Sequence, residues 1–154
     1  MSVRTSLIST LLTTSLLAAL PAGADERAGT FKAINGSVSI DRSGDTLTPV
    51  IGDGVMTGDL ITTQNASFAA VTLIDGTRLT AGPNSEMVIN DFAFDTTTHE
   101  GRLNANVKKG SLAVISGKLS KANPDSVRFN TGSMTLGVRG TEFIIEAAGG
   151  AGDE

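Results

Sequence analysis

The chain has 154 residues, and its 12 Lys and Arg residues against 16 Asp and Glu residues give a formal net charge of −4 at pH 7. This negative charge argues against binding to nucleic acid, whose phosphate backbone attracts clustered Lys and Arg. The chain contains no Cys, Trp or Tyr. The absence of Cys excludes disulfides, thiolate metal ligands, a thiol nucleophile and an acylated N-terminal cysteine.

The N-terminal residues have the pattern of a secretory signal peptide, which we assign to residues 1–24. Arg4 is the only charged residue before Asp25, and residues 7–20 form an uncharged, largely apolar run. As a helix this run spans about 21 Å, short of a hydrocarbon core of roughly 30 Å, so an uncleaved membrane anchor is the weaker alternative. Ala22 and Ala24 are the small residues that signal peptidase requires. We therefore expect cleavage before Asp25, a periplasmic or secreted location, and no transmembrane segment after cleavage.

Residues 25–146 carry the pattern of a single β domain. Apolar and polar residues alternate through Leu103, Ala105 and Val107, and no window has a helical period bounded by caps. Asp75-Gly76 between two apolar runs predicts a tight turn. We expect loops at 91–101 and 116–126, and a disordered, glycine-rich tail at 147–154. Short strands are expected near residues 38–40, 68–74, 87–89, 103–107, 112–115, 127–129, 134–136 and 143–145.

Many short strands separated by glycines predict an all-β fold, which could be a sandwich, a barrel or a solenoid. Turn signals recur throughout, but they follow no strict sequence period. The strand pattern alone therefore leaves the architecture open.

Several short motifs, taken in their order, resemble the FecR domain. They cover most of the chain after the signal peptide, and each is an apolar strand-like run broken by glycine. The motifs are Asn35-Gly36-Ser37-Val38, Gly58-Asp59-Leu60-Ile61-Thr62-Thr63, Leu73-Ile74-Asp75-Gly76-Thr77, Pro83-Asn84-Ser85, Lys109-Gly110-Ser111-Leu112 and Val138-Arg139-Gly140-Thr141-Glu142-Phe143.

The resemblance implies an all-β module of the kind found in the extracytoplasmic part of bacterial signal regulators and in stand-alone exported proteins. It favours a short β-solenoid-like stack, with a sandwich as the alternative. It also implies that the motif residues are mainly structural, with the Asp side chains capping turns and Phe143 filling the core. These residues are Gly58, Asp59, Asp75, Gly76, Arg139, Gly140, Thr141 and Phe143.

No catalytic or metal-binding constellation is recognisable in the sequence. His99 is the only histidine, and the acidic segment 41–45 lacks the further ligands of a calcium loop. We therefore predict no enzyme activity, no cofactor and no metal. The expected function is protein binding or sensing in the cell envelope, with another envelope or secreted protein as partner.

Two other functions stay open. One is a cell-envelope glycan-binding protein or hydrolase that uses Asp53, Asp59 or Asp75, since paired carboxylates can perform acid–base catalysis. The lack of Trp and Tyr weighs against it, because sugars commonly stack on aromatic rings. The other is a structural role in an extracellular matrix.

Overall fold

The computed structural model describes residues 27–138 and 142–149, and the strands within them join into one sheet. The signal-peptide positions Ala22, Ala24 and Asp25 lie outside these residues. The strands are β1 (Arg27–Asn35), β2 (Val38–Arg42), β3 (Asp45–Leu47), β4 (Gly54–Met56), β5 (Leu60–Thr63), β6 (Phe68–Leu73), β7 (Arg78–Ala81), β8 (Glu86–Phe94), β9 (Gly101–Ile115), β10 (Val127–Thr131), β11 (Thr135–Gly137) and β12 (Glu142–Ala147).

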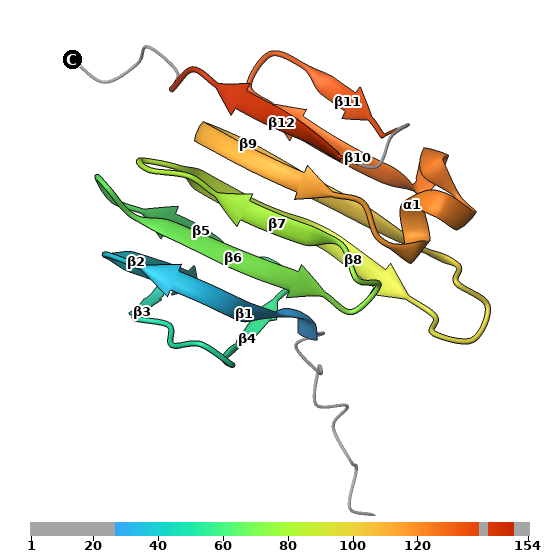
Figure 1. Cartoon of the computed structure of the whole chain (residues 1–154), viewed down its shortest axis with the longest axis horizontal. Coiled ribbons are helices and arrows are strands. Elements are labelled where there is room, and N and C mark those ends of the chain that lie inside the picture. The colour runs from blue at the N-terminus through green and yellow to red at the C-terminus, as the bar shows by residue number, and fades with distance from the viewer. Residues whose placement is uncertain (1–26, 139–141, 150–154) are drawn as a thin grey trace, which may run out of the picture.

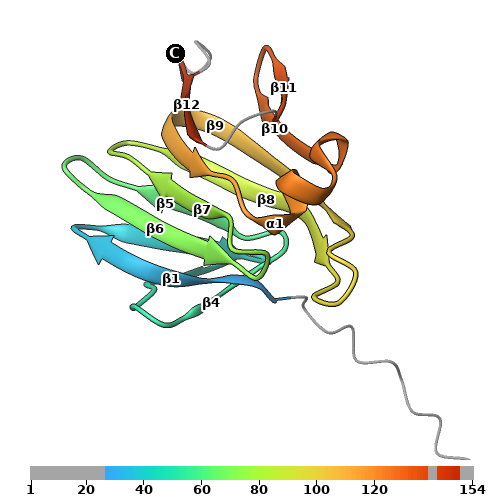
Figure 2. The same ribbon diagram turned by 45° about the vertical axis from the view of Figure 1, so that its right-hand side comes forward.

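The sheet is curled into a half-barrel with two arms (Figure 1). The first arm has the order β4-β1-β6-β7-β9-β12, and the second has the order β3-β2-β5-β8-β9-β10-β11. β9 belongs to both arms, because residues 101–109 pair with β8, whereas residues 112–115 pair with β7 and residues 110–115 pair with β12. All neighbouring strands are antiparallel except β10 and β9. Figure 2 shows the strands stacked from β1 and β4 up to β11 and β12.

Four of the chain segments that pass from one arm to the other share a common bend, and we call each of these four a rung. They are β1–β2, β5–β6, β7–β8 and β9. At the bend, every rung has one residue with a positive φ, and a serine follows it directly. The pairs are Gly36-Ser37, Ala66-Ser67, Asn84-Ser85 and Gly110-Ser111, with φ values of 75°, 54°, 50° and 82° at the first residues.

Buried hydroxyl groups connect the rungs at this bend. The Ser67 Oγ accepts the backbone N–H of Ser37, the Thr63 Oγ1 accepts that of Ser85, and the Ser85 Oγ accepts that of Ser111, each at 2.9 Å. Ser67, Thr63 and Ser85 are all buried. Buried backbone N–H groups need partners, so these hydroxyls supply the hydrogen bonds that the ladder loses where the chain turns.

A single apolar core lies between the two arms. Phe31 and Leu79 contribute from the first arm, and Ile61 and Phe129 contribute from the second; all four are fully buried. Leu119, on the short helix α1 (Lys118–Ala122), joins the same cluster. Burying one such side chain contributes roughly 1.5–3 kcal/mol, so the packing of the arms against each other is a main source of stability.

The expected all-β single-domain fold is confirmed. The rungs stack one on the next as in a solenoid and their arms face each other as in a sandwich, but neighbouring rungs run in opposite directions. The predictions for the two long loops are corrected: the loop 91–101 is shorter than expected, and the segment 116–126 is partly helical. Residues 91–94 extend β8, and the segment 116–126 contains α1 and the 3-10 helix Pro124–Ser126. None of the helices in the described part of the chain could span a membrane.

Candidate functional site

Asp59 of the Gly58-Asp59 motif forms an ion pair with the partly buried Arg42 at the end of a rung. Gly58 and Asp59 lie between β4 and β5, and Asp59 is completely buried. Its carboxylate accepts two hydrogen bonds from the Arg42 guanidinium, at 2.8 and 2.7 Å, and one from the backbone N–H of Met56 at 2.8 Å. Arg42 also donates to the carbonyl of Gly54 at 3.0 Å. This carboxylate therefore ties β2 to the β4–β5 turn.

The Asp75-Gly76 motif forms the tight turn between β6 and β7, and Gly76 has a φ of 85°. Asp75 is buried, and its carboxylate accepts the backbone N–H of Thr77 at 3.0 Å and the Thr77 hydroxyl at 2.7 Å. The Thr77 hydroxyl in turn accepts the N–H of Gly117 at 3.1 Å, and the Asp75 carbonyl accepts that of Lys118 at 2.9 Å. The motif therefore holds the start of α1 against the β6–β7 turn.

Each of the three carboxylates considered for glycan chemistry accepts a hydrogen bond from a backbone N–H group in a nearby turn. Asp53 is exposed, and it accepts the backbone N–H of Val50 at 2.9 Å in the loop before β4. Asp59 and Asp75 are buried. No group of three or more His, Asp or Glu side chains with the geometry for a metal ion occurs within the described residues.

The last family motif is only partly described, because Arg139, Gly140 and Thr141 lie outside the described residues. Val138 is buried before this gap. Phe143 lies on β12, half-buried, and its ring packs edge-on against that of Phe129 at a centroid distance of 5.5 Å and an angle of 75°. This contact joins the first arm to the second at the C-terminal end of the stack.

The edge strands of the sheet differ in length, and therefore in the number of backbone groups that have no partner strand. Each arm has two edges, and three of the four edge strands, β3, β4 and β11, have 3 residues each. The fourth, β12, has 6 residues and pairs only with β9 among the described strands. A strand edge carries unpaired N–H and C=O groups that can pair with another chain. β12 is therefore the longest free edge in the described structure.

The outer face of β12 carries exposed side chains. Glu142, Ile144 and Glu146 all point to this face, and Ile144 is 69% exposed. The alternating residues Phe143 and Ile145 point toward the core. Sequence reasoning identified this strand but not its position, because nothing in the local pattern shows that it lies last in the sheet.

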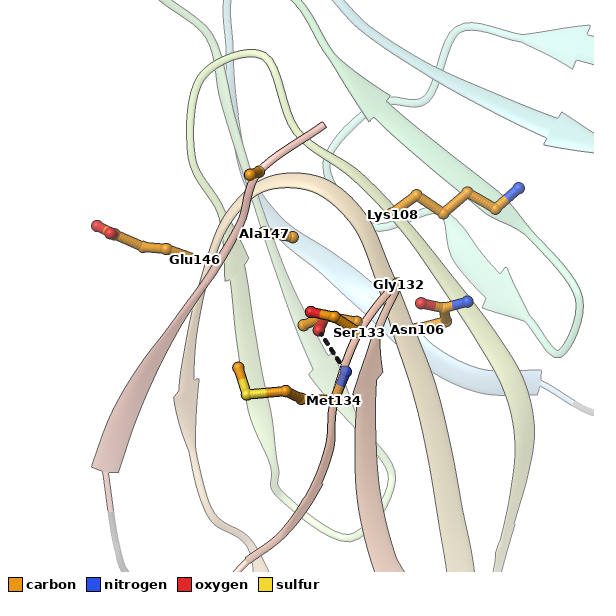
Figure 3. Close-up of a pocket in the computed structure, with 9 residues that line it drawn as sticks. Asn106, Lys108, Gly132, Ser133, Met134, Glu146 and Ala147 are labelled. Carbon is orange, nitrogen blue, oxygen red and sulfur yellow. Dashed lines mark hydrogen bonds between the residues drawn. The ribbon is translucent and has the colours of Figure 1, made fainter. Parts of the chain in front are cut away.

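A groove of about 420 Å³ continues from the C-terminal end of β12 toward the β10–β11 turn (Figure 3). The Oδ1 atom of Asn106 is buried in this region and has no hydrogen-bond partner within the described residues. The groove is lined by Asn106, Lys108, Thr131, Gly132, Ser133, Met134, Glu146, Ala147 and Ala148.

Comparisons with known proteins give one family match. No curated protein matches the chain. A solved structure described as a "Cell surface anchoring domain" is similar over 40% of this chain and 82% of its own, with 22% sequence identity and a TM-score of 0.39. The family model described as "FecR protein" matches residues 59–153, which is more than half of the 154 residues, and the chain therefore belongs to the FecR family.

Proposed function

We propose that this protein is an exported, non-catalytic module of the cell envelope that binds another protein through the free edge of β12. The observation that carries the proposal is the contrast between this six-residue edge and the three-residue strands at the other edges. Strand addition to a free edge is a common mode of peptide recognition, because backbone hydrogen bonds provide affinity and side-chain pockets provide specificity.

The family supports the same function. Resemblance to the extracytoplasmic module of bacterial signal regulators makes envelope sensing the natural context for a FecR protein. The signal-peptide pattern that ends at Ala24 supports a periplasmic or secreted location. The partner in this proposal is an envelope protein, such as a transporter or a membrane regulator, and the module takes part in signalling by docking onto it.

The carboxylates argue against glycan hydrolysis. A general acid or base must reach the substrate within hydrogen-bond distance, directly or through one water. Asp59 and Asp75 are buried, and their oxygens are engaged by Arg42, Met56 and Thr77. The proposed function therefore assigns both aspartates to the fold.

Photocrosslinking in cells of the source organism tests the proposal. A photoreactive residue replaces Ile144 on β12, and the matched control replaces Ile51, which is similarly exposed at 63% but lies in the loop between β3 and β4 at the opposite end of the stack. We expect a discrete crosslinked product from Ile144 and none from Ile51. The same product from both positions, or none from Ile144, would contradict docking at β12. Capture of a membrane regulator or transporter would support the signalling role.

A further inference from the structure

The free edge of β12 has a charge pattern that defines its partner, if the proposed function above holds. Glu142 and Glu146 flank Ile144 on the exposed face of the strand. Neither carboxylate forms an ion pair within the described residues. Among the described residues, the edge therefore presents two negative charges without an ion-pair partner, on either side of one large apolar side chain.

The neighbouring strand does not neutralise these charges. In the register between β12 and β9, Glu142 is opposite Ile115 and Glu146 is opposite Ser111. The basic residues Lys108 and Lys109 precede Gly110, which pairs with Ala147, the last residue of β12. They lie at the bend, and although Lys108 lines the same groove as Glu146, the two form no ion pair, so the strand edge itself is acidic.

A second copy of the chain is a poor occupant for this edge. An antiparallel pair of two β12 strands that centres on Ile144 aligns residues 142–146, and it places Glu142 of each copy opposite Glu146 of the other. A parallel pair in register places each glutamate opposite or diagonal to its own counterpart. Like charges directly opposite each other destabilise a strand pair, so both arrangements are disfavoured.

The inner face of β12 also restricts which side chains the partner strand can carry. Phe143 is half-buried at the end of the first arm, and Ile145 beside it is buried. A strand added outside β12 would place alternate side chains over the exposed part of Phe143, because successive side chains point to opposite faces. Apolar side chains at those positions would extend the core.

We propose that β12 binds a basic, amphipathic β-strand of another protein. On the outer face of that strand, two Lys or Arg residues flank an apolar residue, so that the cations lie opposite Glu142 and Glu146 and the apolar residue lies opposite Ile144. On its inner face the residues are apolar. Opposite-charge and apolar cross-strand pairs both stabilise such an arrangement.

Two synthetic peptides test the charge requirement by titration calorimetry with the mature protein. The basic peptide is Thr-Lys-Val-Val-Val-Lys-Thr, and the acidic control replaces both lysines by glutamate. We expect the basic peptide to bind at least about fivefold more tightly, given the usual energies of cross-strand charge pairs. In the double variant Glu142→Lys/Glu146→Lys the preference should reverse. Equal affinity of the two peptides for either protein would overturn the proposal.

Alternate N-methylation of the basic peptide tests strand addition itself. Every second residue of an added strand directs its N–H toward β12, and the others direct it away. Methylation of one alternate set of amides should abolish binding, while methylation of the other set should preserve it. If both methylated peptides bind as well as the parent, the attraction is electrostatic without strand pairing, and the proposal is wrong.

The peptide experiments and the crosslinking experiment test different claims: the peptides test the chemistry of the partner strand, and the crosslink tests docking at β12. A crosslink from Ile144 together with no preference between the peptides would retain docking at β12 and overturn the basic strand as its occupant. A dimer whose formation depends on β12 would also overturn it, and analytical ultracentrifugation of wild-type protein and the Glu142→Lys/Glu146→Lys variant measures this. The double variant must keep the wild-type melting temperature, which we expect because both glutamates are exposed.

Discussion

The hydroxyl of Ser85 bridges two rungs by contacting both backbone groups of Ser111. Its Oγ accepts the N–H of Ser111 at 2.9 Å and lies 3.1 Å from the Ser111 carbonyl, to which it can donate. The carbonyl of Pro83, also at 3.1 Å, is the alternative acceptor. One buried side chain thus replaces the ladder hydrogen bond at the point where β9 bends from the second arm into the first.

Replacement of Ser85 by Ala should destabilise the fold by about 1–3 kcal/mol, because the buried N–H of Ser111 would lose its partner. Ser39 on the outer face of β2 is a suitable control, since it is only half-buried and Ser39→Ala should change stability by no more than about 0.5 kcal/mol. Urea unfolding of the two variants measures the difference. Equal free energies of unfolding would show that water replaces the Ser85 hydroxyl.

Gly110→Ala should be more destabilising than the replacement of an exposed glycine that has a similar positive φ. Gly110 has a φ of 82°, and an added Cβ would lie 2.2 Å from the Ser85 Oγ and 2.7 Å from the Asn84 carbonyl oxygen. Gly44 has a φ of 93° but has nothing within 4 Å. We expect Gly44→Ala to cost about 1–2 kcal/mol from backbone strain alone, and Gly110→Ala to cost several kcal/mol in addition. Thermal melting separates the strain from the clash, and similar melting temperatures would contradict the tight packing at the bend.

Asp59→Asn should be strongly destabilising, because it removes the charge that compensates the partly buried guanidinium of Arg42. Loss of one partner from a buried pair costs about 3–5 kcal/mol, and retention of the amide oxygen should place this variant near the lower end. The control is Asp91→Asn. Asp91 pairs with Arg102 on the surface, where such pairs contribute about 0–1 kcal/mol. A cost for Asp59→Asn no larger than that for Asp91→Asn would contradict the structural role of the Gly58-Asp59 motif.

Asp95 should titrate below the usual range for an aspartate. The backbone N–H groups of Thr98 and then Thr97 donate to its carboxylate, at 2.9 and 2.7 Å, and they lower its pKa. A lowered pKa in the folded state means that the loop gains order from the carboxylate above the unfolded pKa and loses it as pH falls through the folded one. NMR titration of the Thr97 and Thr98 amides should therefore give a midpoint below the pKa of an aspartate in an unfolded peptide. These amide shifts should not titrate in Asp95→Asn.

Local patterns in the sequence predict individual elements of this fold well. The alternation through Leu103, Ala105 and Val107 lies within β9, and all three side chains are buried. The Asp75-Gly76 pair forms the β6–β7 turn. In both cases the determining interactions are between residues close in sequence, so a short window contains the necessary information.

The long-range relationships were not accessible in the same way. Lys108, Lys109 and Gly110 interrupt the apolar pattern, so β9 reads as two strands although one strand runs through both arms. Arg42 pairs with Asp59 across 17 residues, and the partners of the buried serines lie on different rungs. α1 has only 5 residues and no side-chain cap, and thus leaves no helical period to detect. The position of β12 at the sheet edge likewise depends on the order of all other strands.

Because β9 runs through both arms, the two arms are coupled when the molecule unfolds. The other rungs cross the bend through a turn between two separate strands, whereas β9 crosses it within a single strand, paired with β8 on one side of Gly110 and with β7 and β12 on the other. Neither arm can therefore lose its central strand while the other stays intact. Hydrogen exchange should show the amides of β7 and β8 opening together, with one free energy, as a single cooperative unit.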